Sequence, residues 1–181
     1  VPARATLGAP RRPGRFPLVL FGTALTGPSY LHASLCEFLA GHGYVAAAIP
    51  SIPARAGQDL AFDGKAVLLQ AEDLRFAFHE MQSHPSVAPG KAALGAWSVG
   101  GVATALLAMR NSNIVALVSL DAATGYRYGK ELLEASPHYD AGAANAAYLH
   151  LTDSMQSLRV PKNFDYLERV ARGPAYLVEI P

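Results

Sequence analysis

The sequence predicts an α/β fold built on a doubly wound, mostly parallel sheet with helices on both faces. Three observations carry this prediction. Short apolar runs of strand length alternate with longer segments of helical period, glycine and proline separate the two kinds of segment, and polar residues directly follow several of the apolar runs. Strand, helix and strand in succession imply parallel pairing with a right-handed crossover.

The first quarter of the chain shows this alternation. Residues 1–15 alternate loosely as far as Leu7 and then meet several glycines and prolines, which predicts an edge strand and a turn. Phe16–Phe21 is rich in β-branched and aromatic residues and predicts a buried strand. A helical face starts at Tyr30 and ends before Gly41 and Gly43, and Tyr44–Ile49 predicts the next strand.

The longest helix is expected at Lys65–Ser83, after a loop from Ser51 to Gly64. Its apolar residues recur on one face, and its charged residues lie mainly elsewhere. The members of the apolar face are Ala71, Leu74, Phe78 and Met81. Pro85 and the pair Pro89–Gly90 are expected to end this helix and to form a turn.

The segment from Lys91 to Ala122 is the centre of the prediction. Ala92–Trp97 is a short apolar run typical of a buried strand, Ser98 follows at once, and a helix-forming segment begins near Val102. A serine between a strand and a helix, with small residues around it, is typical of a nucleophile elbow. The usual first glycine of Gly-x-Ser-x-Gly is Ala96 here. The alternative is that Ser98 only caps the helix.

The remaining elements continue the alternation to the end of the chain. We expect strands at Ile114–Leu120, Ala147–Leu151 and Ala175–Ile180, a short helical piece at Glu131–Ala135 and a helix at Asn163–Ala171. With these, the chain holds about six buried strands. Residues 1–181 are expected to form one domain, because 181 residues with 51% hydrophobic content suffice for a single core.

Polar residues converge on one edge of this predicted sheet. In parallel sheets ligands gather at the carboxyl ends of the strands, and Ser98, Asp121 and Asp153 each close a strand there. A serine nucleophile needs a histidine base, which a carboxylate orients. Asp121 is the first candidate for the acid because it ends the next strand, and Asp153 is the competitor. Either aspartate could instead cap a turn.

The base is not found among the six histidines. Three lie on or beside helices, one lies in a Gly-His-Gly turn, one in the variable loop, and His150 lies inside a strand and is expected to point into packing. In chain order the base should follow the last strand, so we expect it just beyond Pro181. The fold is therefore expected to be truncated at the C-terminus and perhaps at the N-terminus.

The oxyanion hole is predicted from position. One N–H would come from Val99, the residue after the nucleophile, and the other from Leu25 in the loop after the first buried strand. None of the Gly-Lys pairs is followed by serine or threonine, so no phosphate loop is expected. No histidine or cysteine pair has the spacing of metal ligands. We expect neither a metal nor a cofactor.

Composition excludes several other classes. A formal net charge of +1 gives no strong field for nucleic acid, and no run approaches the roughly twenty apolar residues of a membrane span. The chain is therefore not expected to be an integral membrane protein, and secretion and a cytoplasmic location both stay open. Cys36 cannot form an intrachain disulfide and is expected to pack as a small apolar residue. Oligomeric state is left open by the sequence.

The first strand–helix–strand unit from Phe16 to Pro50, the motif AWSVGG and the strand ending in SLDA resemble the α/β-hydrolase superfamily. Within it they are similar to the platelet-activating-factor acetylhydrolase and dienelactone-hydrolase-like esterases. The resemblance extends from about Phe16 to Ile180. In the acetylhydrolase branch the acid follows the strand after the elbow, where Asp121 stands. In the dienelactone hydrolase branch it follows the next strand, nearer Asp153.

The function expected from these residues is that of a serine-dependent carboxylic ester hydrolase working through an acyl-enzyme. Its small-molecule substrate would be an ester with a short to medium acyl group, because Leu25, Trp97, Tyr126 and Tyr128 would line an apolar mouth. The tryptophan before the serine also resembles polyester-degrading, cutinase-like enzymes. The alternative is a binding protein, or a fragment, of the same fold that lacks the histidine.

Overall fold

The computed structural model describes residues 4–24, 27–50, 63–140, 142–153, 160–170 and 173–181. Its sheet has six strands in the order β2-β1-β3-β4-β5-β6, and every neighbouring pair is parallel. The strands are β1 (Phe16–Gly22), β2 (Val45–Ile49), β3 (Val87–Ser98), β4 (Ile114–Ala122), β5 (Ala147–Asp153) and β6 (Ala175–Ile180). The α/β class predicted from the sequence is confirmed.

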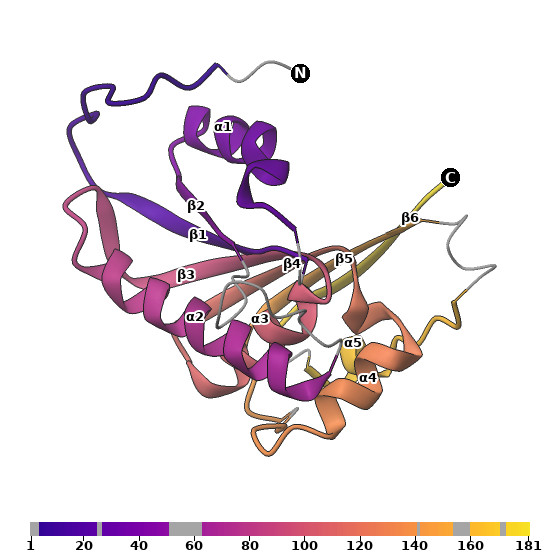
Figure 1. Cartoon of the computed structure of the whole chain (residues 1–181). Helices are drawn as coiled ribbons and strands as arrows, with labels where there is room; N and C mark the ends of the chain where they lie inside the picture. Colours follow the sequence, from indigo (N-terminus) through magenta and orange to yellow (C-terminus); the bar gives the residue numbers. More distant parts are fainter. Residues whose placement is uncertain (1–3, 25–26, 51–62, 141, 154–159, 171–172) are drawn as a thin grey trace, which may run out of the picture.

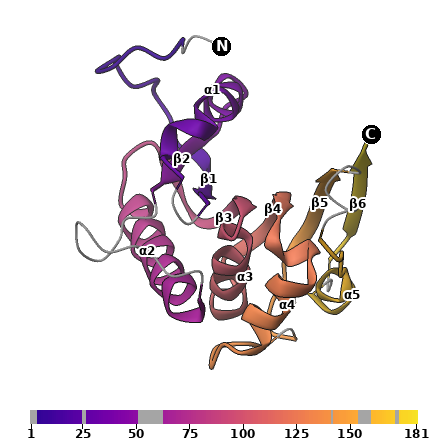
Figure 2. The same ribbon diagram turned by 45° about the vertical axis from the view of Figure 1, so that its right-hand side comes forward.

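Helices cover the two faces of the sheet unequally. The helical elements are η1 (Ser29–His32), α1 (Ala33–Gly41), α2 (Gly64–Gln82), α3 (Gly100–Arg110), η2 (Ala123–Gly125), α4 (Arg127–Glu134) and α5 (Asp165–Val170). Figures 1 and 2 show α1 on one face, beside β1 and β2, and α2, α3, α4 and α5 on the other. Among the described residues, no helix covers β4, β5 or β6 on the α1 face.

The core lies between the sheet and the four-helix layer. Leu74 of α2 and Leu106 of α3 are fully buried against Leu20 of β1 and Leu94 of β3. Asp63 caps the N-terminus of α2, because its carboxylate accepts a hydrogen bond from the Ala66 amide at 2.9 Å. Burial of such leucines stabilises the fold by about 1.5–3 kcal/mol each.

Several elements differ from the sequence-based expectation. Residues 4–7 form no strand, and Pro89–Gly90 lies inside β3 rather than in a turn. The β1–β3 register jumps from Phe16↔Val87 to Leu18↔Ala92, so the extra residues form an irregularity and the pairing then resumes. The helix expected at 131–135 begins earlier, at Arg127, and the last helix begins at Asp165.

The last strand was expected to be buried, and it is not. All six residues of β6 are exposed, because β6 is an edge strand that pairs with β5 on one side. Beside it, the residues of β4 and β5 that point away from the helices, such as Leu120 and Leu151, are only half-buried. No described helix is long and apolar enough to cross a membrane.

Candidate active site

Ser98 occupies a strained turn between β3 and α3. Its backbone φ is +54°, in the left-handed region that a non-glycine residue rarely adopts. This conformation costs about 1–2 kcal/mol, which the surrounding packing must supply. The residue that caps α3 is Val99, and no side-chain hydrogen bond caps the helix. The alternative of Ser98 as a capping residue therefore has no support in the geometry.

The small residues after Ser98 let α3 pass close to the sheet. A Cβ atom built on Gly100 would lie 2.5 Å from the carbonyl oxygen of Gly22 and 2.6 Å from that of Thr23. A Cβ atom on Gly101 would lie 2.5 Å from the Ala122 Cβ atom. Both glycines are fully buried. Only glycine fits at these two positions, and the sharp turn at Ser98 depends on them.

Asp121 lies on the strand next to that of Ser98, one residue before the residue that pairs with Ser98. The β3–β4 register pairs Trp97 with Leu120 and Ser98 with Ala122, so Asp121 is the extra residue of a bulge. Its φ is +49°, which makes it the second non-glycine residue in the left-handed region among those described. Two strained residues therefore lie at the carboxyl ends of adjacent strands.

The Asp121 carboxylate accepts several hydrogen bonds, and all of those found among the described residues reach its Oδ1 atom. The Tyr126 hydroxyl donates at 2.5 Å, the Thr152 hydroxyl at 3.3 Å and the Asp153 amide at 3.5 Å. The sequence had suggested that Tyr126 lines an open apolar mouth. The side chain is only 2% exposed, so its ring is buried instead. Burial raises the pKa of Tyr126 to about 12, and the hydrogen bond to Asp121 is the second largest cause of this rise.

An apolar pocket of about 470 Å³ opens beside these residues. Its lining residues come from the ends of four neighbouring strands: Trp97, Leu120, Asp121, Leu151, Thr152, Asp153, Ile180 and Pro181. Trp97, at 40% exposed, was expected here. The sequence analysis did not predict Leu120, Leu151 and Ile180 as pocket residues. The alternation of side chains along each strand places them on one face of the sheet.

The second aspartate, Asp153, lies one strand farther from Ser98. It ends β5 and pairs with Ile180 of β6, whereas Asp121 lies on the strand that pairs directly with β3. Asp153 lines the same pocket. The topology therefore brings both carboxylates to the carboxyl edge, with Asp121 nearer the serine.

The oxyanion residues are only partly described. Val99 is buried at the start of α3, where the first N–H groups of a helix have no partner within the helix and carry partial positive charge. This position suits the binding of a developing oxyanion. Leu25 lies outside the described residues. No group of three possible metal-ligating side chains occurs in the described ranges.

The histidines take other roles. His32 is buried and stacks on Phe21 with ring centroids 5.5 Å apart, and burial lowers its pKa. The Nδ1 atom of His42 contacts the Phe38 carbonyl group at 2.7 Å. His150 is fully buried in β5, beside Phe164. No hydrogen bond within the described ranges joins a histidine to Ser98 or Asp121.

His150 should make the fold sensitive to acid. Burial lowers its pKa to about 4, the Asp121 charge opposes this shift, and the Lys162 charge adds to it. The ring is neutral in the folded state but takes up a proton near pH 6.5 when unfolded. Its stabilising contribution is therefore complete above pH 6.5 and is lost as the pH falls from 6.5 to 4.

We therefore expect His150→Leu to lose less stability in acid than the wild type. Between pH 7 and pH 5 the wild-type free energy of unfolding should fall by about 2 kcal/mol more than that of the variant. Urea denaturation of both proteins at the two pH values measures this difference. Equal losses would mean that His150 takes up its proton at the same pH in the folded protein as in the unfolded chain.

Fold comparisons agree with this geometry. No protein-family model matches the chain, and no curated protein matches its sequence. The search of solved structures finds the α/β-hydrolase fold. The chain superposes on a dienelactone hydrolase from Anabaena variabilis with a TM-score of 0.72 and 21% identity, over 93% of this chain and 76% of that one.

Two further structures show how widely the fold is shared. A ferulic acid esterase from Streptomyces cinnamoneus gives a TM-score of 0.64 at 20% identity, over 96% of this chain and 53% of that one. An acylaminoacyl peptidase from Pyrococcus horikoshii gives a TM-score of 0.64 at 13% sequence identity, over 94% of this chain and 33% of that one. At these identities the comparisons establish the fold, and the chemistry must be argued from the site.

Proposed function

We propose that this chain is a serine-dependent carboxylic ester hydrolase. The observation that carries the proposal is Ser98, a non-glycine residue with a φ of +54° between β3 and α3, with Asp121 at the end of the adjacent strand. Strained residues of this kind cluster at active sites, because the strain presents the side chain in one fixed direction. Esterases among the proteins of similar fold add general support.

In the proposed reaction Ser98 Oγ attacks the carbonyl carbon of the ester. The hydroxyl proton passes to a base, and the oxyanion accepts hydrogen bonds from the Val99 and Leu25 amides. The alcohol leaves with that proton, and water then attacks the acyl-enzyme, releases the acid and restores the Ser98 hydroxyl. Asp121 would orient the base and stabilise its charged form, with Asp153 as the alternative acid.

The pocket supports an ester with an apolar acyl group of short to medium length. A volume of about 470 Å³ lies within the usual range for small-molecule sites. Leucine, isoleucine and tryptophan side chains would contact the acyl group, and two aspartates also line the pocket. The nearby carboxylates make a neutral acyl chain a better fit than an anionic one.

A second candidate function is ligand binding without turnover. It is favoured by one observation: no described histidine is hydrogen-bonded to Ser98 or Asp121. Such a protein would use the same pocket to hold an apolar acyl compound. The two candidates differ in whether Ser98 is an activated nucleophile.

Covalent labelling distinguishes the two candidates. A fluorophosphonate reacts with an activated serine by forming an Oγ–P bond and releasing fluoride. We expect one adduct per chain, located by mass spectrometry on the peptide that contains Ser98. A matched control is Ser112→Ala, in an exposed turn, which should be labelled to the same extent. Absence of the adduct from the wild-type chain would favour the binding protein.

A further inference from the structure

We propose that Tyr126 is a positioning residue for Asp121, and that its hydroxyl group fixes one carboxylate oxygen so that the other is presented to the base. This inference rests on the proposed function. The hydrogen bonds from Tyr126, Thr152 and Asp153 to Asp121 share the Oδ1 atom. In a hydrolase, the carboxylate that orients the base must keep one oxygen available for the N–H of the base. Hydrogen bonds that all reach the other oxygen meet this requirement.

The chain around Tyr126 is built to return its hydroxyl group to Asp121. The short helix η2 reverses the chain directly after β4, and the Tyr126 amide donates to the Ala123 carbonyl at 2.9 Å. Gly125 makes this return possible, because a Cβ atom there would lie 2.3 Å from the Nε2 atom of His150. Tyr126 thus reaches the carboxylate five residues before it.

Backbone pairing holds Tyr126 from the other side. Tyr126 forms an isolated antiparallel bridge with Lys162, the Arg127 amide donates to the Pro161 carbonyl at 3.0 Å, and the Asn163 amide donates to the Gly125 carbonyl at 2.8 Å. The rings of Tyr126 and Tyr128 stack with centroids 5.9 Å apart. The phenol is therefore fixed by contacts that do not involve Asp121.

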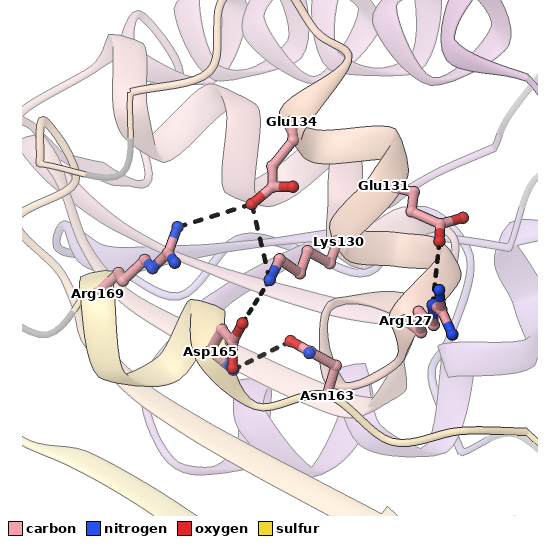
Figure 3. A network of polar contacts seen from close by, with 7 residues as sticks. All are labelled: Arg127, Lys130, Glu131, Glu134, Asn163, Asp165 and Arg169. Carbon is pink, nitrogen blue, oxygen red and sulfur yellow. Dashed lines mark hydrogen bonds and ion pairs between the residues drawn. The ribbon is translucent and has the colours of Figure 1, made fainter.

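Ion pairs join α4, the helix directly after Tyr126, to α5, the helix after the segment that contains Lys162 (Figure 3). Lys130 of α4 contacts Asp165 of α5, and Arg169 of α5 lies 3.6 Å from Glu134 of α4. The Asn163 side chain accepts a hydrogen bond from the amide of Asp165, the first residue of α5, at 3.1 Å. Each of these surface pairs contributes little alone. Together they link α4, which follows Tyr126, to α5, which follows the segment that pairs with Tyr126.

The proposal predicts that Tyr126→Phe lowers kcat for ester hydrolysis and leaves KM unchanged. Loss of a hydrogen bond to a charged group corresponds to a factor of about 10 to 100. KM should stay constant because Tyr126 is not among the residues that line the pocket. Thr152→Val should lower kcat less, since its hydroxyl lies 3.3 Å from Oδ1 and that of Tyr126 lies 2.5 Å away.

The matched control is Tyr166→Phe. Tyr166 is another buried tyrosine, 3% exposed, and its hydroxyl group has no hydrogen-bond partner in the described part of the chain. Removing it deletes the same atom from the same type of environment and should leave kcat unchanged. A comparable loss of kcat in both variants would mean that burial of a phenol, rather than the contact with Asp121, matters, and would overturn the proposal.

Proton NMR supplies a readout that does not depend on turnover. The Tyr126 hydroxyl proton should give a slowly exchanging downfield resonance, absent from Tyr126→Phe, shifted in Asp121→Asn and unchanged in Tyr166→Phe. An active wild type with normal kcat in Tyr126→Phe overturns the positioning role alone. An inactive wild type that still shows the resonance overturns the esterase function and, with it, this role.

Discussion

With a base available to Ser98, replacing this serine by alanine is expected to reduce the hydrolysis of p-nitrophenyl acetate by at least about a thousand-fold, because the substitution removes the atom that forms the acyl-enzyme. Folding should be unaffected, since alanine and serine have the same conformational cost at a φ of +54°. Initial rates at several substrate concentrations and a thermal unfolding curve measure the two effects.

The control for this experiment is Ser112→Ala, a serine in the exposed turn after α3. It should keep the wild-type rate and the wild-type unfolding temperature. If the wild type, Ser98→Ala and Ser112→Ala all hydrolyse the ester at one slow rate, Ser98 is not the nucleophile and the esterase function is wrong.

The largest expected effect on stability comes from Gly129→Ala. In a helix this substitution normally stabilises by up to about 1 kcal/mol. At Gly129 a Cβ atom would lie only 1.8 Å from the carbonyl oxygen of Ala123, so α4 would have to move away from η2. We expect a net loss of about 3 kcal/mol or more in the free energy of unfolding.

Gly64→Ala tests the same substitution without the contact. Gly64 lies in the first turn of α2, and nothing lies within 4 Å of a Cβ atom built there. Urea denaturation should show a small gain in stability for Gly64→Ala and a large loss for Gly129→Ala. A gain in both variants would contradict the close packing of α4 on η2.

The sequence predicted the parts of the site that depend on local pattern. Ser98 and Asp121 each follow an apolar run of strand length, and parallel strands end at one edge of a sheet. Those two facts sufficed to place the residues on neighbouring strands. The burial of His150 was also predicted, because it lies inside an apolar strand.

The predictions that failed concern contacts that leave no signal in the hydrophobic pattern of the sequence. The role of Tyr126 requires the reversal at η2 and the bridge to Lys162, and neither leaves a periodic pattern in the sequence. The exposure of β6 was missed for a related reason. An apolar run such as Ala175–Ile180 looks the same whether a strand is central or lies at an edge.

The outer side of β6 has a consequence for the behaviour of the protein at high concentration. Within the described residues β6 is paired only with β5, and Tyr176, Val178 and Ile180 are each more than two-fifths exposed. Open backbone groups beside apolar side chains can recruit a strand from another chain. Colloidal stability should therefore depend on this edge, and a lysine in place of Val178 would act as a gatekeeper against strand addition.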